Sequence, residues 1–318
     1  MKILAVGGAG YIGSVLIPML LDRGYVVDVV DLLWFGNKLP EEVKIVQKDL
    51  FDLKKDDLVD YDQVIFLAGL SNDPMAEFSP SKNFIFNGAA PAYLAYIAKL
   101  AGVKRYIYAG SCSVYGYTVE ELYDEDSPAI CNYPYGISKL QGEKGVFQMC
   151  DDNFSVIGFR QGTVCGYSPR MRLDLVVNTM FKCAIQDGEI VVNNPAIWRP
   201  ILDIRDAATA YIRAIEANEG ISGIFNIASG NYTVGELGDI VRNEVRRLLN
   251  IEAKLTIKHI KDYRNYKVSI EKARNMLSFK PRHNVESTVQ HLVENVNKFN
   301  AFDNIEYYNI QVFKQLGR

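Results

Sequence analysis

The fold is decided by residues 1–31, MKILAVGGAGYIGSVLIPMLLDRGYVVDVVD. This stretch begins with a short apolar run, Lys2–Val6, and passes directly into the turn GGAGYIG. An apolar pattern with helical spacing follows over residues 14–22, and a second apolar run over residues 25–30 ends on Asp31. We therefore expect a strand, a tight turn, a helix and a second strand that carries an acid at its tip.

Three glycines of the turn, Gly7, Gly10 and Gly13, stand three residues apart. In a dinucleotide-binding unit the first allows the tight turn, the second lets the backbone approach a pyrophosphate, and the third lets helix and strand pack closely. The pyrophosphate then lies on the exposed amides of the helix N-terminus. Glycine spacing alone is weak evidence in a chain with 24 glycines. Because strand, glycines, helix and acid share one short unit, the stretch predicts a dinucleotide site.

Asp31 indicates which dinucleotide is expected. It follows Gly13 by 18 residues, close to the usual spacing for a carboxylate that accepts hydrogen bonds from the adenosine ribose hydroxyls. A carboxylate at this position would repel the 2'-phosphate of NADP. We therefore expect NAD as the cofactor.

Further apolar runs at residues 43–46, 63–68, 105–109 and 154–159 alternate with helical patterns. Strands that alternate with helices predict an α/β fold, a Rossmann-type doubly wound parallel sheet with helices on both faces. Ligands bind such sheets at the carboxyl ends of the strands. The predicted site therefore extends to the residues that follow each strand.

Asp49 follows the third predicted strand and is a candidate contact for the adenine amino group. Asn87 opens the next predicted helix, whose apolar face runs over residues 93–100, and it either caps this helix or contacts the cofactor. The expected cofactor contacts are Gly7, Gly10, Tyr11, Ile12, Gly13, Asp31, Asp49, Leu50, Leu67, Ala68, Gly69 and Asn87, together with Tyr135 and Lys139.

After Arg160 the alternation of strands and helices becomes less regular, although a helical pattern covers residues 175–186 and an apolar run at residues 225–228 is typical of one more core strand. We expect two interleaved portions. Residues 1–165 form an NAD-binding Rossmann domain, to which residues 200–229 return. Residues 166–199 and 230–318 form a smaller C-terminal α/β substrate-binding portion.

Composition and charge exclude several classes of partner. The chain of 318 residues carries a net charge of −3 and no basic block, so neither nucleic acid nor an anionic membrane is expected to bind. No apolar run reaches the roughly 18 residues that cross a bilayer, and we expect a cytoplasmic protein. The five cysteines show no zinc-like spacing, and the histidines, His259, His283 and His291, lie far from the glycine turn. We therefore expect no metal site and no catalytic histidine.

The fifth predicted strand ends in GSCSVYG, residues 110–116, and YGISK follows at residues 135–139. Tyr135 and Lys139 are four positions apart, so on a helix both can address one ligand. A nearby cation favours the phenolate, and we expect Lys139 to lower the pKa of Tyr135 from about 10 and make it a general base near neutral pH. Ser111 is expected to hydrogen-bond the same substrate oxygen.

A second Y-x-x-x-K occurs at Tyr263 and Lys267, so the spacing alone does not identify the catalytic pair. We prefer the first copy because it follows the Rossmann-type half and a strand end that bears a serine. The second copy lies in a charged segment far downstream.

Taken together, GGAGYIG, Asp31, GSCSVYG and YGISK resemble the extended short-chain dehydrogenase/reductase family, the NAD-dependent epimerases and dehydratases of nucleotide sugars. The resemblance covers nearly the whole chain. It implies that Ser111, Tyr135 and Lys139 are the catalytic residues and that Lys139 also holds the nicotinamide ribose. It further implies a homodimer, for which residues 83–100 and 135–149 are the candidate interface helices.

The resemblance extends to the predicted substrate contacts. WRPILDIRD, residues 198–206, is similar to the family's R-D-Y-I-H-V-x-D, which implies that Arg199 contacts the sugar-nucleotide diphosphate. Arg264, in DYRNY, matches a second phosphate-binding position less closely. For both arginines a surface ion pair is the alternative. The expected substrate contacts are Ser71, Ser113, Thr163, Arg170, Arg199 and Arg264.

The chain also departs from the family pattern. Cys112 and Ser113 stand where the family's 4,6-dehydratases carry the Asp-Glu pair that supplies the acid for eliminating water. Thr163 stands where asparagine is usual, and residues 71–73 occupy the place of a lysine found in many 4-epimerases. Residues 168–178 also resemble a segment of GDP-heptose 4-dehydrogenases.

The resemblance implies an enzyme that oxidises carbon 4 of a nucleoside-diphosphate sugar with NAD, as a 4-epimerase or a 4-dehydrogenase. A 4-keto-sugar reductase or a dehydratase is the alternative among enzymes. A non-catalytic NAD-binding regulator is the alternative from another class. A regulator would keep the glycines without needing Ser111, Tyr135 and Lys139 together.

Overall fold

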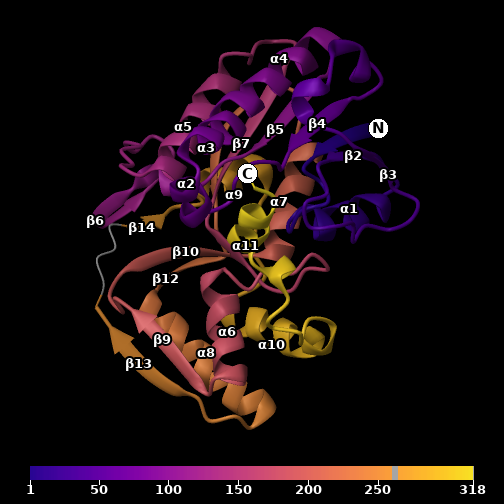
Figure 1. Ribbon diagram of the computed structural model, residues 1–318. Helices are drawn as coiled ribbons and strands as arrows, with labels where there is room; N and C mark the ends of the chain where they lie inside the picture. Colours follow the sequence, from indigo (N-terminus) through magenta and orange to yellow (C-terminus); the bar gives the residue numbers. More distant parts are fainter. Residues whose placement is uncertain (260–263, 318) are drawn as a thin grey trace.

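Seven parallel strands form the central sheet of the computed structural model, which describes residues 1–259 and 264–317 (Figure 1). Each neighbouring pair is parallel, and Val6 lies opposite both Val30 and Phe66. The sheet confirms the predicted Rossmann-type α/β fold. In spatial order the strands are β3 (Lys44–Gln47), β2 (Val26–Asp31), β1 (Lys2–Val6), β4 (Gln63–Phe66), β5 (Arg105–Ala109), β7 (Ser155–Gln161) and β11 (Gly223–Ile227).

Helices cover both faces of this sheet. The buried residues Leu16, Ile17 and Leu20 recur at helical spacing and turn one side of the first helix toward the strands. One face is covered by α1 (Gly13–Leu21), α7 (Ile204–Glu216) and α9 (Glu271–Leu277), and the other by α4 (Ala90–Ala101) and α5 (Pro134–Phe147).

One helical segment before β5 contains a π-helical turn, Ile85–Ala89, between α3 (Pro80–Phe84) and α4. Asn87 lies within this turn and therefore does not cap a helix. The preceding helix, α2 (Asp73–Phe78), begins directly after the loop that follows β4, and Asn72 caps it by accepting a hydrogen bond from the Met75 amide.

A smaller portion lies below the sheet in Figure 1 and has its own apolar core. Strand β6 (Tyr117–Tyr123) pairs in parallel with β14 (Asn265–Val268), so segments distant in sequence meet between the two portions. The strands of the smaller portion are β8 (Thr163–Cys165), β10 (Trp198–Asp203) and β12 (Gly230–Thr233) in one sheet, and β9 (Glu189–Asn193) and β13 (Lys254–Lys258) in another. Its helices are α6 (Val176–Gln186), α8 (Val234–Leu249) and α10 (Val285–Asn295).

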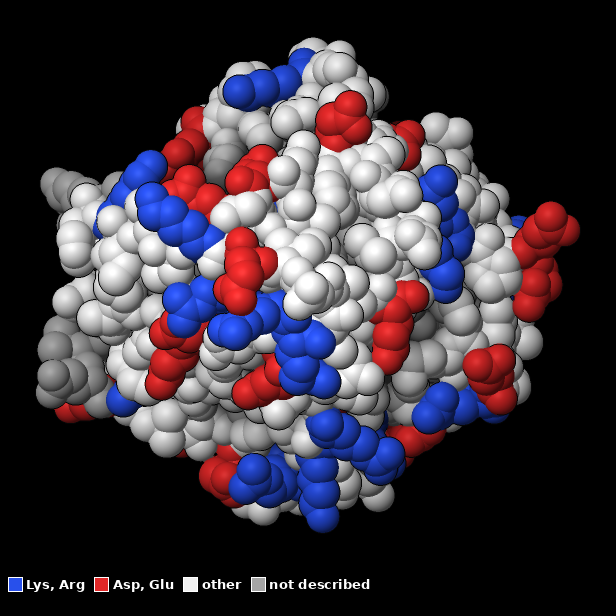
Figure 2. Space-filling view, turned by 90° about the horizontal axis from the view of Figure 1, so that it is seen from below, with Lys and Arg blue, Asp and Glu red and all other residues white. Residues whose placement is uncertain are grey.

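The chain closes with a short helix, α11 (Asn309–Gln315), which packs on α2. Figure 1 shows this helix in front of the junction between the two portions. Among the described residues, no helix is both long enough and apolar enough to cross a membrane. Acidic and basic side chains are intermingled over the face shown in Figure 2.

Candidate active site

A cavity of about 1080 Å³ lies at the carboxyl ends of the central strands and extends into the smaller portion. It brings together every predicted site residue except Asn87. The predicted residues that line it are Gly7, Gly10, Tyr11, Ile12, Gly13, Asp31, Asp49, Leu50, Leu67, Ala68, Gly69, Ser71, Ser111, Ser113, Tyr135, Lys139, Thr163, Arg170, Arg199 and Arg264.

The glycine turn has a geometry that other residues cannot adopt. Gly7 has a φ of +80°, and a Cβ at this position would overlap the Ala68 backbone. A Cβ at Gly13 would overlap the Gly8 carbonyl. By contrast, a Cβ at Gly10 would meet only the Gly7 carbonyl oxygen, at 3.2 Å, because Gly10 faces the open cavity. The space beside Gly10 suits the close approach of a pyrophosphate.

Asp31, the last residue of β2, lines the cavity next to the glycine turn. Its carboxylate accepts hydrogen bonds from the Ala9 amide at 3.0 Å and the Leu33 amide at 2.8 Å. Burial raises the pKa of Asp31, and these amides oppose the rise. The carboxylate is therefore anchored at the tip of β2, where the sequence predicts the adenosine ribose.

Arg170 also lies toward this end, although the resemblance places it among the substrate contacts. Only 4% of the residue is exposed, its guanidinium lies 3.6 Å from the centre of the Phe35 ring, and its charge acts on Asp31. Burial and the charge of Arg172 lower the pKa of Arg170 to about 9. Arg170 therefore lies near Asp31, at the end of the cavity where the sequence predicts the cofactor.

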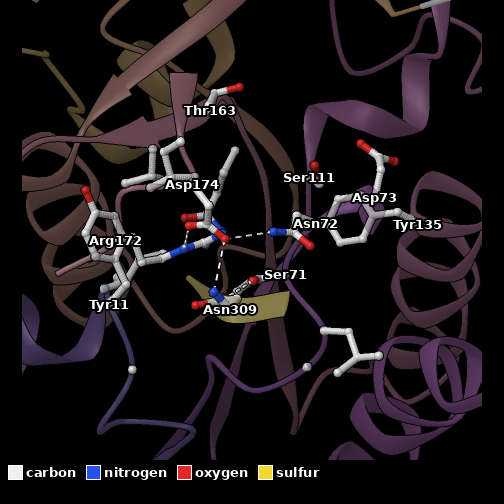
Figure 3. A pocket seen from close by; sticks show the side chains of 18 of the residues that line it. Tyr11, Ser71, Asn72, Asp73, Ser111, Tyr135, Thr163, Arg172, Asp174 and Asn309 are labelled. Atoms are coloured by element: carbon white, nitrogen blue, oxygen red, sulfur yellow. Dashed lines mark hydrogen bonds and ion pairs between the residues drawn. The ribbon is translucent and has the colours of Figure 1, made fainter. Parts of the chain in front are cut away.

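The predicted catalytic residues come from two adjacent elements. Ser111 follows β5, and its Oγ donates a hydrogen bond to the Ser113 Oγ at 3.1 Å. Tyr135 lies in the first turn of α5, and Lys139 lies one turn later. Ser111 and Tyr135 lie near each other in Figure 3. A hydroxyl, a phenol and an amine therefore share the part of the cavity beyond the glycine turn.

The expected effect of Lys139 on Tyr135 is not found. Burial and then the negative charge of Asp73 raise the pKa of Tyr135, against a hydrogen bond from Ser111 and the charge of Arg172. Lys139 donates instead to the Ala109 carbonyl oxygen at 3.1 Å, and burial lowers its own pKa to about 8. Its Nζ lies 6.0 Å from the centre of the Tyr135 ring.

Asn87 neither caps a helix nor lines the cavity. It is buried and donates hydrogen bonds to the Leu70 carbonyl oxygen at 2.9 Å and to the Asn83 Oδ1 at 2.8 Å. A Cβ at Gly69 would overlap its Oδ1. Asn87 therefore supports the loop after β4 from behind, and that loop forms the cavity wall.

A buried polar network, not foreseen from the sequence, crosses the cavity wall (Figure 3). Asp174 pairs with Arg172 through two contacts of 2.8 and 3.1 Å and accepts a hydrogen bond from the Asn72 Nδ2 at 3.0 Å. Asn309 of α11 donates its backbone amide to Asp174 at 3.3 Å and its side-chain amide to the Ser71 Oγ at 2.6 Å. The C-terminal helix is thus part of the site.

Two further arginines line the cavity. Arg199 is 8% exposed and donates to the Trp198 and Arg264 carbonyl oxygens. Arg264 pairs with Asp73 at 2.7 Å. Burial rules out a surface ion pair for Arg199, and the partly exposed ion pair of Arg264 lies within the cavity wall.

Of the second Y-x-x-x-K, only Lys267 lies within the described residues. Tyr263 lies outside the described residues. Lys267 lies in β14 with its Nζ 4.8 Å from the centre of the Trp198 ring, and it does not line the cavity. All five cysteines are free thiols. Among the described residues no cluster of histidine, cysteine, aspartate and glutamate can hold a metal ion.

Comparisons with known proteins agree with this geometry. The model of the NAD dependent epimerase/dehydratase family matches residues 3–228. The UDP-glucose 4-epimerase of Corynebacterium glutamicum is 25% identical over 303 residues, which cover 89% of this chain and 92% of the relative. That of Halalkalibacterium halodurans is 26% identical over 320 residues, which cover 92% and 94%.

Solved structures show the same fold. The UDP-glucose 4-epimerase of Thermotoga maritima with UDP-glucose superposes with a TM-score of 0.84 at 22% identity, over 94% of this chain and 99% of the other. MoeE5 with UDP-glucose and NAD gives a TM-score of 0.83 at 23% identity, over 95% and 100%. MoeE5 is also known in complex with UDP-glucuronic acid and NAD.

Proposed function

Because the chain belongs to the NAD-dependent epimerase/dehydratase family, we propose that it is a 4-epimerase that oxidises and re-reduces carbon 4 of a nucleoside-diphosphate sugar. The observation that carries the proposal is that Ser111, Tyr135 and Lys139 line the same cavity as the glycine turn. The curated relatives named above, both UDP-glucose 4-epimerases, favour this outcome over a 4-dehydrogenase.

The residues around the glycine turn fit NAD. Gly10 leaves room for the pyrophosphate, and Asp31 offers a partly buried acceptor at the tip of β2. When bound, NAD accepts a hydride and returns it. Lys139, whose amine donates to the Ala109 carbonyl oxygen, is proposed to hold the nicotinamide ribose.

Tyr135 is proposed to take the proton from the hydroxyl on carbon 4 and to return it when the ketone is reduced. The Ser111 hydroxyl, which interacts with Tyr135, orients the same substrate oxygen. Because the pKa of Tyr135 is raised in the protein alone, its ionisation needs positive charge from outside the chain. The oxidised nicotinamide, which carries such a charge, would favour the phenolate.

Arg199 and Arg264 are proposed to contact the diphosphate of the substrate, because both line the same cavity as the catalytic residues. Arginine suits this role since its planar fork of donors matches phosphate oxygens. We further propose a cytoplasmic homodimer that acts in carbohydrate biosynthesis.

The test is a panel of UDP-, GDP-, CDP- and dTDP-hexoses incubated with the purified protein and followed by NMR and mass spectrometry. We expect one nucleotide sugar to reach equilibrium with its 4-epimer without added NADH. Accumulation of a released 4-keto sugar with stoichiometric NADH would instead identify a 4-dehydrogenase. No change in any sugar would contradict the proposal.

A further inference from the structure

Asp73, the first residue of α2, carries a carboxylate that the proposed mechanism does not use. One oxygen, Oδ2, accepts a hydrogen bond from the Arg264 guanidinium at 2.7 Å. The other, Oδ1, is buried and has no hydrogen-bond partner among the described residues. Asp73 lines the cavity. A buried carboxylate oxygen without a donor is costly, so this atom points to a ligand that supplies one.

Asp73 lies beside the reacting centre. Figure 3 shows its carboxylate next to the Tyr135 ring, with Ser111 nearby. Among the charged groups that act on the Tyr135 phenol, Asp73 has the largest effect. If Tyr135 takes the proton from the hydroxyl on carbon 4, the neighbouring substituents of the sugar therefore lie near Asp73.

The cations near Asp73 are already paired or lie elsewhere, so they do not neutralise the negative charge that Asp73 would present to the sugar. Arg172 is satisfied by its two contacts with Asp174, and Arg170 lies toward Asp31 and Phe35. Arg264 already holds one oxygen of Asp73. Lys48 pairs with Asp57, and the proposed function assigns Lys139 to the ribose and Arg199 to the diphosphate. Among the described residues that line the cavity, no cation is therefore left for a carboxylate on the sugar, which would meet the open oxygen of Asp73.

We infer that Asp73 accepts a hydrogen bond from the hydroxyl on carbon 6 of the sugar and thereby selects neutral nucleotide sugars over nucleotide hexuronates. The inference rests on the proposed function. An ionised carboxylate only accepts hydrogen bonds, so a hydroxyl donor satisfies it and a uronate carboxylate is repelled by it. The fold alone does not determine whether a neutral sugar or a hexuronate binds, since MoeE5, which has the same fold, is known in complex with UDP-glucose and with UDP-glucuronic acid.

The test compares UDP-glucose with UDP-glucuronic acid, which share the nucleotide and differ at carbon 6. Calorimetric affinities and single-turnover reduction of bound NAD are measured on the NAD-loaded enzyme. We expect the parent to prefer UDP-glucose by about 10- to 100-fold, the size of a charge-assisted hydrogen bond. In Asp73→Asn, whose amide also donates, the ratio should fall by about tenfold or more.

Two comparisons make the result specific. Glu42→Gln removes the same charge from an exposed position that does not line the cavity, and the ratio should stay at the parent value. If Asp73 merely held Arg264, Asp73→Asn would weaken both sugars equally, because both carry the same diphosphate. An unchanged ratio in Asp73→Asn, or a parent that prefers UDP-glucuronic acid, overturns the inference and leaves the proposed function standing. Failure of both sugars to bind or to reduce NAD overturns the inference, and it overturns the proposed function as well only if the panel of UDP-, GDP-, CDP- and dTDP-hexoses also gives no reaction.

Discussion

Burial and the negative charge of Asp73 raise the pKa of Tyr135, whereas the Ser111 hydrogen bond and the charge of Arg172 lower it. At neutral pH the protein alone therefore holds Tyr135 as a neutral phenol. That form can return a proton to a sugar oxygen, while the reverse step needs added positive charge. The base strength of Tyr135 is thus expected to depend on the bound cofactor.

Tyr135→Phe tests this residue directly. The substitution removes one oxygen and leaves the ring to pack, so the fold and the NAD affinity should change little. General acid–base catalysis typically contributes about 10²- to 10⁴-fold in rate, and reduction of bound NAD in a single turnover should slow by this amount. The nicotinamide absorbance, followed with the true sugar nucleotide, gives the rate.

Tyr263→Phe is the control, since it breaks the other Y-x-x-x-K of the chain. Its turnover should stay near that of the parent. If Tyr135→Phe reduced NAD as fast as the parent, or if Tyr263→Phe were the slower variant, the catalytic pair would be assigned wrongly.

Burial of Lys139 makes the free energy of unfolding of the protein depend on pH. Burial lowers its pKa from 10.5 to about 8. The buried ammonium therefore destabilises the fold fully below pH 8, and this cost fades as the pH rises toward 10.5. Lys139→Met removes the group. In NAD-free protein its stability relative to the parent should be higher at pH 7 than at pH 10, by between about 1 and 3 kcal/mol.

Urea unfolding of both proteins at the two pH values measures this difference. The comparison between pH values matters more than the sign at pH 7, because Lys139→Met also loses the hydrogen bond to the Ala109 carbonyl oxygen. A stability difference that is the same at both pH values would show that Lys139 titrates normally.

The residues whose conformation or spacing is set by their near neighbours in the chain were predictable from the sequence. Gly13 is required by the approach of the Gly8 carbonyl within one turn, Gly7 has a φ of +80°, and Tyr135 and Lys139 are placed by helical spacing. Asn87 was not predictable, because its role depends on the loop after β4. The Tyr135 pKa was predicted in the wrong direction, since burial and the charge of Asp73 outweigh a lysine that donates to the Ala109 carbonyl oxygen.

At the scale of elements, α11 lies against the cavity. Asn309 donates to Ser71 and accepts from Arg170 at 2.5 Å. Phe313 is fully buried and packs against Trp34 and Phe78 with ring centres 5.7 and 6.0 Å apart. The helix thereby joins the loop after β2, α2 and the Arg170 segment, which surround the expected path of the cofactor.

Phe313→Ala should loosen this helix. Removing a buried phenylalanine costs about 3 to 5 kcal/mol in a well-packed core, enough to undock a helix of seven residues. We expect bound NAD to exchange at least tenfold faster while the rest of the fold persists. Exchange against labelled NAD, with circular dichroism as the check on folding, measures the effect.

Leu316→Ala is the matched control, because Leu316 follows the same helix and is partly exposed. It should leave NAD exchange unchanged. Equal exchange rates in Phe313→Ala and the parent would show that α11 does not retain the cofactor.

The strands and most helices were predictable, because each follows from a local apolar pattern. The strands expected at residues 43–46 and 105–109 are β3 and β5. The place of α11 was not predictable, since a seven-residue helix carries little pattern. Its contacts reach residues such as Ser71, 238 positions earlier.

At the scale of the whole molecule, the cavity exists only because two portions meet. Arg264 and Asp73 form an ion pair although 191 positions separate them. The sequence indicates both residues by their motifs. It does not indicate that they touch, because this contact depends on how the smaller portion docks on the sheet. The ion pair between Asp73 and Arg264 in the cavity wall was therefore the part of the site that the sequence left open.

The helical segment before β5 exposes apolar side chains that are relevant to the proposed homodimer. Tyr96 and Leu100 are 51% and 50% exposed, and they lie four residues apart on one face of α4. Ile85, in the π-helical turn, is 46% exposed. Large apolar side chains gathered on one helix face are typical of an interface, and this segment is one of the two expected to form the homodimer.

Tyr96→Glu combined with Leu100→Glu tests the proposed dimer. A two-fold interface repeats each residue, so the double change brings like charges together across it. We expect the parent to be a dimer at micromolar concentration by light scattering and the variant to be a monomer with the same circular dichroism. Lys99→Glu, on the same helix but paired with Asp151, should remain dimeric. A monomeric parent would refute the assembly, and a dimeric double variant would place its interface on another surface.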